Sequence, residues 1–126
     1  MAEKMGWTIE LAGSEHALVP AVPALVTIER ATGRTLFGLV DRSRSEGFAL
    51  TDMAVIAIAL AGVKAPAESE LATLYEALSS GLTGAPVERM TAMLADAGLV
   101  QVSARLLPPL VAALSGGVDA EGVTKG

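Results

Sequence analysis

An eleven-residue run of apolar residues and glycine, from Met53 to Val63, most constrains what this chain can fold into. It belongs to a helix predicted from Asp52 to about Lys64. Thr51 is expected to cap this helix, and the Asp52 carboxylate lies near the positive end of its dipole. Because apolar side chains occupy every face, the helix must be buried on all sides. The sequence therefore predicts a central helix, enclosed by its own chain or partly covered by another chain.

Shorter helices are predicted on both sides of this run. They cover residues 24–32, 36 to about 43, 66 to about 80, 86–97 and 99–115, with residues 42–47 as a polar loop. Gly33 is expected to end the first and Thr35 to cap the second. A continuous helix through Gly33 is the alternative, at a cost of roughly 1 kcal/mol relative to alanine. Pro108 removes a backbone donor, so the last segment is predicted to split near Leu107.

The N-terminal residues have the pattern of a β-hairpin. Residues 7–11 alternate between apolar and polar side chains, as in a half-buried strand, and residues 16–19 form the second strand. A two-residue type II′ turn at Gly13-Ser14 would pair Leu11 with His16. Since an isolated hairpin is marginally stable in water, we expect this one to pack on helices.

Composition favours helices around an aliphatic core. Hydrophobic residues make up 52% of the 126 residues and aromatic residues 3%, and alanine and leucine are strong helix formers. The core is expected to include the four large rings, Trp7, Phe37, Phe48 and Tyr75. We predict an α+β fold, predominantly α-helical, with an N-terminal β-hairpin packed on a bundle of about five or six short helices. Residues 1–117 are expected to form one domain, and residues 118–126 a disordered tail.

Several kinds of active site have no residues from which to build them. The chain has no cysteine, which excludes disulfides, thiolate metal sites and cysteine nucleophiles. The one histidine, His16, has no sequence neighbour with metal-ligand or Ser-His spacing. The nearest carboxylate pairs, Glu68/Glu70 and Asp119/Glu121, are two residues apart and are interpreted as solvated surface. We predict no catalytic, metal or cofactor site, so the protein is expected not to be an enzyme.

Charge and hydropathy limit the partners. A net charge of −5 and a pI near 4.8 argue against a dedicated nucleic-acid binder. The longest apolar stretch is shorter than the roughly 20 residues that a membrane-spanning helix needs. Residues 1–6 lack the apolar region of a signal peptide. We therefore expect a cytoplasmic protein without a membrane partner.

The one basic concentration in the chain consists of Arg30, Arg34, Arg42 and Arg44. With Asp41 they give residues 30–44 a charge of +3, whereas the remaining residues carry −8. Three interpretations stay open: a rim paired with acidic neighbours, a docking surface for an acidic protein or a second copy of this chain, and a nucleic-acid surface. Met93, near the edge of the apolar stripe of its helix, is a further candidate for partner contact.

The order of the segments resembles a known family. The resemblance is carried by the hairpin of residues 7–11 and 16–19, Ile28-Glu29-Arg30-Ala31-Thr32-Gly33-Arg34-Thr35-Leu36, Phe48-Ala49-Leu50-Thr51-Asp52-Met53-Ala54-Val55-Ile56 leading to Leu60-Ala61-Gly62-Val63, and Ala113-Leu114-Ser115-Gly116-Gly117. With these stretches, from Trp7 to Gly117, the chain is similar to the small tail assembly proteins encoded by gene transfer agents and related prophages of α-proteobacteria.

The resemblance implies a non-enzymatic role in building a phage-like tail. The implied function is that of a tail assembly chaperone, which shields the helical tape-measure protein and helps to recruit tail-tube subunits. The family is also labelled tail tube protein, so a structural tail-tube subunit is the near alternative. A small intracellular adaptor or regulator is the second alternative, and a homo-oligomer is left open. No catalytic residues come with the family.

Overall fold

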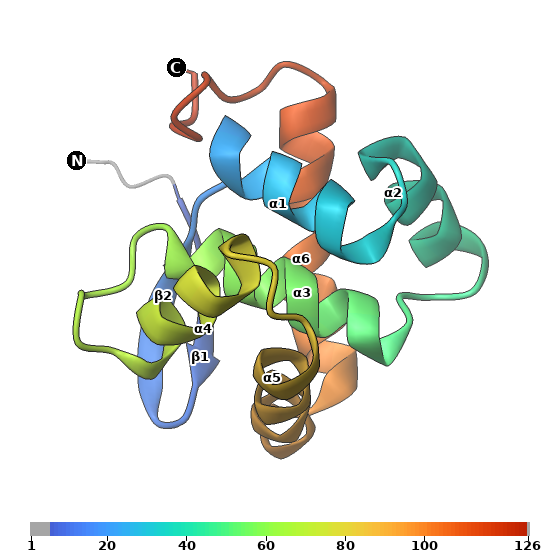
Figure 1. The fold of residues 1–126 in the computed structure, drawn as a ribbon. Helices are drawn as coiled ribbons and strands as arrows, with labels where there is room; N and C mark the ends of the chain where they lie inside the picture. The colour runs from blue at the N-terminus through green and yellow to red at the C-terminus, as the bar shows by residue number, and fades with distance from the viewer. Residues whose placement is uncertain (1–5, 126) are drawn as a thin grey trace.

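The structure, a computed structural model, describes residues 6–125 as two short strands followed by six helices (Figure 1). They are β1 (Trp7–Leu11), β2 (Ser14–Leu18), α1 (Val22–Thr32), α2 (Leu36–Ser45), α3 (Leu50–Gly62), α4 (Glu70–Ser79), α5 (Gly84–Ala97) and α6 (Leu99–Leu114). The predicted class, an α+β fold that is predominantly helical, is confirmed. Residues 1–5 and 126 lie outside the described residues. Residues 1–5 make up most of the segment that was assessed above for the features of a signal peptide.

Helix α3 lies at the centre of the molecule and packs against α1, α4, α5, α6 and β2 (Figure 1). Every residue from Asp52 to Gly62 is buried, and the side chains of Ile56 and Ile58 have no exposed surface. The prediction of a helix buried on all sides is confirmed, and the chain itself supplies the cover.

The end of α1 and the start of α2 follow the sequence signals. Gly33 has a φ of 71° and donates its backbone N–H to the carbonyl oxygen of Glu29 at 2.9 Å. The Thr35 hydroxyl oxygen accepts a hydrogen bond from the Gly38 N–H at 3.0 Å. Two separate helices are therefore present, and the continuous helix through Gly33 is excluded.

Several helix boundaries differ from the prediction, and α1 and α5 each begin two residues earlier, at Val22 and Gly84. Helix α2 continues to Ser45, so Arg42 and Arg44 are helical, and the loop predicted over residues 42–47 is wrong for residues 42–45. Arginine is a good helix former, and cations near a helix C-terminus interact favourably with the dipole. Helix α3 begins at Leu50, so the cap predicted at Thr51 is wrong.

The start of α4 is set by a side-chain cap rather than by proline. Pro66 does not open the helix, because residues 66–69 form a turn in which the Ser69 N–H donates to the Pro66 carbonyl oxygen at 2.9 Å. The Ser69 hydroxyl oxygen then accepts from the Ala72 N–H at 3.0 Å. This satisfies one of the N–H groups that a helix N-terminus leaves unpaired.

The strands β1 and β2 pair antiparallel in a register that differs from the predicted one. Leu11 lies opposite Ser14, and Ile9 lies opposite His16. The turn residues are Ala12-Gly13, with φ angles of 52° and 80°. Positive φ at both positions belongs to a type I′ turn, so the predicted type II′ turn at Gly13-Ser14 is wrong.

Contacts beyond the hairpin explain the observed register. In the predicted register Pro20, the residue directly after the second strand, would have stood opposite Trp7, where proline has no N–H to donate. In the structure β2 ends before Val19, and the Val19 N–H donates to the carbonyl oxygen of Leu60 in α3 at 2.9 Å. The hairpin is thus tied directly to the central helix.

Helix α6 runs without a break from Leu99 to Leu114 and contains two prolines. The predicted split near Leu107 is therefore wrong. A proline inside a helix costs about 3 kcal/mol because it removes a hydrogen bond and its ring crowds the preceding turn. Leu106 and Leu110 are fully buried on the same helix, and burying each contributes about 1.5–3 kcal/mol. Packing of α6 on the core offsets the cost of its prolines.

The C-terminal segment after α6 folds back beside the start of α1 (Figure 1). The carbonyl oxygen of Ala120 accepts from the Val22 N–H at 2.9 Å. Gly122 is buried with a φ of 82°, and a Cβ there would approach the backbone nitrogen of Ala21 to 2.7 Å. Disorder of residues 118–126 in solution stays a prediction, and these contacts show how the segment packs when ordered.

Candidate partner-binding surface

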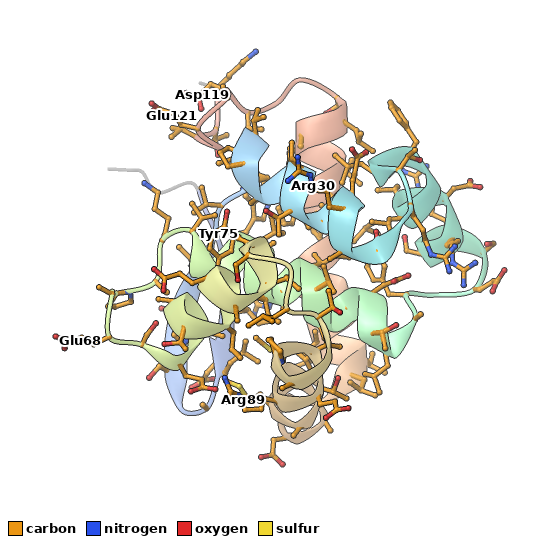
Figure 2. All side chains as sticks on the ribbon, viewed as in Figure 1. Arg30, Glu68, Tyr75, Arg89, Asp119 and Glu121 are labelled. Carbon is orange, nitrogen blue, oxygen red and sulfur yellow. The ribbon has the colours of Figure 1, made fainter. Side chains whose placement is uncertain are left out.

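The four arginines of the predicted basic surface come from α1, α2 and the loop between them. Arg30 is in the last turn of α1, Arg34 is in the loop, and Arg42 and Arg44 are in the last turn of α2. Figure 2 shows Arg30 on the outer side of α1. Arg30 lines a depression beside the end of α4, whereas Arg44 lines a groove beside α6. The two arginines therefore face different surroundings.

Arg34 is paired with a buried carboxylate. Its Nε lies 3.4 Å from Oδ2 of Asp52, a residue that is 6% exposed. Asp52 is in the first turn of α3, where the helix dipole stabilises a negative charge. This ion pair connects the loop between α1 and α2 to the central helix, so Arg34 has a role in the fold.

Arg42 is also engaged within the chain. Its Nη2 lies 4.0 Å from Oε1 of Glu46, the residue that follows α2. Glu29 of α1 uses its carboxylate to accept the Leu36 N–H at 3.0 Å, at the start of α2. Arg30 and Arg44, by contrast, form no ion pair with any residue that the structure describes.

The charges around α2 cancel. Residues 29–52 contain four arginines and four carboxylates, so they carry no net charge, and the net charge of −5 belongs to the remainder of the chain. The excess of +3 predicted for residues 30–44 is balanced in the fold by Glu29, Glu46 and Asp52. Residues 29–52 are therefore a neutral segment of an acidic protein.

A groove of about 560 Å³ lies between α2 and the C-terminal part of α6. Its lining consists of Phe37, Gly38, Val40, Asp41, Arg44, Val111, Leu114 and Ser115. Phe37 is 71% exposed, so the prediction that its ring belongs to the core is wrong. The other three rings, Trp7, Phe48 and Tyr75, are half-buried and pack against the core.

The sequence carried a signal for the exposed Phe37. Asp41 and Arg44 follow it at i+4 and i+7 and therefore lie on the same face of α2. Leu39 points to the opposite side and is buried, whereas Val40, three residues after Phe37, is buried at the base of the same groove. The spacing of Asp41 and Arg44 therefore indicates that Phe37 lies on the solvent side of this helix.

Met93 lies elsewhere, in α5. It is half-buried, packs against the core and lines a cavity of about 410 Å³ between the hairpin, α5 and α6. The charged residues that line the same cavity are Glu10, Glu15, Asp96 and Arg105. None of the four arginines considered above lines it. His16 is half-buried in β2, opposite Ile9.

The described residues provide neither a metal-ligand cluster nor a single membrane-spanning helix. Residues 6–125 contain no group of three histidine, aspartate or glutamate side chains placed to hold a metal ion. In the same range no single helix is long and apolar enough to cross a membrane. The consecutive helices α5 and α6 reach the required length and composition together, with a bend of 112° between them.

The protein is a small helical bundle with a β-hairpin packed on it. Its candidate site is a surface groove that is largely apolar and carries an exposed aromatic ring. Residues 6–77 match the family model described as "Phage tail tube protein, GTA-gp10". The match covers more than half of the chain, from β1 into α4, and the chain belongs to this family of phage tail proteins. The resemblance to tail proteins of gene transfer agents and prophages is thereby confirmed. No curated protein and no solved structure matches the chain.

Proposed function

We propose that this protein is a non-enzymatic tail assembly chaperone, which binds the tape-measure protein, the tail-tube protein or both while a phage-like tail is built. Membership of the family supports a role connected with the tail. The predominantly helical fold is the observation that carries the choice of a chaperone. The proposed place of action is the bacterial cytoplasm, where tails are assembled.

The fold supports a chaperone better than a tail-tube subunit. A tube subunit of the β-rich kind joins its neighbours through sheets, and the sheet within residues 6–125 consists of β1 and β2 alone. Glu10 and Glu15 lie opposite each other in this hairpin, and both are exposed. Short edge strands with charged side chains resist the addition of further strands.

Apolar side chains on the outer helices support binding to other proteins. Val22 and Val26 of α1 are 49% and 41% exposed, and Val100 at the start of α6 is 87% exposed. Val22 and Val26 are one helical turn apart, so they lie on one face. An amphipathic partner helix docks on surfaces of this kind, and the tape-measure protein is helical.

Purified tails test the proposal against its near alternative. The chain is co-expressed with the tape-measure and tail-tube proteins of the same particle, and its copy number is measured in assembly intermediates and in finished tails by quantitative mass spectrometry. A chaperone is expected to be present in intermediates and depleted from finished tails. Recovery in finished tails at the copy number of the tube subunit would instead establish a structural tail-tube protein.

A further control separates a chaperone from an adaptor that acts outside assembly. Deletion of the gene for this chain should reduce the yield of tails and leave the tape-measure protein insoluble or degraded. A normal yield of full-length tails in the deletion strain would refute the chaperone function.

A further inference from the structure

The outer face of α2 combines an exposed ring with two charges of opposite sign. This α2 face consists of Phe37, Asp41 and Arg44, at i, i+4 and i+7 of one helix. All three residues line the groove between α2 and α6. Neither Asp41 nor Arg44 forms an ion pair with another residue in the described part of the chain. The α2 face therefore presents an exposed aromatic ring beside one carboxylate and one guanidinium group that form no ion pair within the described residues.

Electrostatics favours this face for contact between two identical molecules. Two copies with a net charge of −5 each repel one another over most of their surfaces. Around α2 the repulsion is reduced, because residues 29–52 carry equal numbers of arginines and carboxylates. Two acidic copies can approach at this neutral region without juxtaposing like charges.

The order of the two charges makes the α2 face complementary to itself. A twofold axis perpendicular to two adjacent α2 helices runs them antiparallel, which reverses the order of Asp41 and Arg44 in the second copy. Each arginine then faces the aspartate of the other molecule, giving two symmetric ion pairs. The same operation places each Phe37 ring beyond Arg44 of the other copy, at the C-terminal end of its α2.

We propose that two copies of this chain associate through their α2 faces about a twofold axis. Arg44 of each copy pairs with Asp41 of the other, and the exposed Phe37 rings are buried at the C-terminal ends of the partner α2 helices. This association goes beyond the proposed chaperone function, since it needs no tail protein and is measured on the purified chain alone.

A charge-swap experiment tests the ion pairs. Sedimentation velocity over a concentration series is measured for the wild type, Asp41→Arg, Arg44→Asp and the double variant. Each single variant places like charges across the axis and should raise the dimer Kd at least about tenfold, with circular dichroism reporting an intact fold. The double variant should return to within about threefold of the wild type.

Mixing the two single variants gives the sharpest outcome. Asp41→Arg presents two cations and Arg44→Asp presents two anions, so a mixture should form a heterodimer although each variant alone is monomeric. A mixture that stays monomeric, or single variants that dimerise like the wild type, overturns the assignment of the ion pairs and with it the proposed interface. A wild type that is monomeric up to about 1 mM does the same.

Phe37→Glu tests the apolar part of the interface. Because the ring is 71% exposed, the variant should fold normally and raise the Kd at least about tenfold, as expected for an aromatic anchor. The matched control is Val100→Glu, which adds the same charge at an exposed apolar position on α6, outside the α2 face. Equal dimerisation of the two variants would contradict the proposal.

Discussion

Helices α2 and α3 are neighbours in the chain and lie within the family match, yet they use their apolar residues in opposite ways. In α3 every residue from Asp52 to Gly62 is buried by the rest of the chain. In α2 Leu39 and Val40 are buried while Phe37 stays 71% exposed. The difference shows that a helix without a polar face forces its chain to surround it. A helix with two faces can keep an apolar residue outside.

Ile56→Asp is expected to have the largest effect, because it places an unpaired charge in the middle of α3. Ile56 has no exposed surface, and the helices around it supply an apolar environment. The cost should exceed about 4–5 kcal/mol, which is comparable to the whole stability of many domains. Far-UV circular dichroism and thermal unfolding measure the loss. Ile56→Val, expected to cost about 0.5–1.5 kcal/mol, is the control.

The opposite result would change the comparison itself. A soluble, fully folded Ile56→Asp protein would mean that this face of α3 is accessible in the free chain. α3 would then resemble α2 in presenting a surface to a partner.

Gly62→Ala tests how closely α3 is packed. A Cβ at Gly62 would clash with the Cβ of Tyr75 and lie 3.2 Å from the carbonyl oxygen of Leu71, both in α4. We expect a loss of about 1–3 kcal/mol in urea unfolding, although alanine is the better helix former. Gly84→Ala is the matched control, since a Cβ there meets no atom within 4 Å. Equal stability of the two variants would show that α4 can move away at no cost.

Arg34→Gln probes the ion pair that connects the loop before α2 to the first turn of α3. The change leaves the buried Asp52 carboxylate without its partner, but the Arg34 side chain is 42% exposed, so solvent screens much of the interaction. The expected loss is about 1 kcal/mol. In an Asp52→Asn background the same substitution should cost almost nothing, which a double-mutant cycle measures. An equal loss in both backgrounds would refute the ion pair as the cause, and Arg30→Gln provides an exposed control.

Local signals in the sequence were sufficient for the central helix and for the junction that follows α1. The apolar run predicts burial because no face of α3 could be left in water. Gly33 and Thr35 mark the end of one helix and the start of the next through backbone and capping preferences that act within a few residues. These features depend on no distant part of the chain.

Two of the predictions that failed depend on distant contacts. The hairpin register is tied to Leu60 of α3 through the Val19 N–H, and no pattern within residues 7–19 contains that bond. The continuous α6 depends on burial of Leu106 and Leu110, which offsets the preference of Pro108 to break a helix. Tertiary packing decided both cases against local preference.

The candidate surface shows a third limit. Counting charges over residues 30–44 predicts a basic surface, but Glu29, Glu46 and Asp52 lie just outside that window and return to the same region in the fold. The groove between α2 and α6 joins residues about seventy positions apart. A sequence window therefore reports the composition of a surface only when the fold adds no other segment to it.

Phe37→Ser should have the smallest effect on the stability of the isolated chain, and it completes the comparison within α2. Because the ring is largely exposed, its removal should change the free energy of unfolding by less than about 0.5 kcal/mol. Leu39→Ser, two residues further along the same helix, removes a side chain that is 1% exposed and should cost more than about 2 kcal/mol. Both are measured by urea unfolding at low protein concentration, where association contributes nothing to stability. A loss above about 1 kcal/mol for Phe37→Ser would mean that the chain's own residues cover the ring in solution. When Phe37→Ser leaves the stability of the isolated chain unchanged, any effect of the substitution on self-association comes from the interface alone.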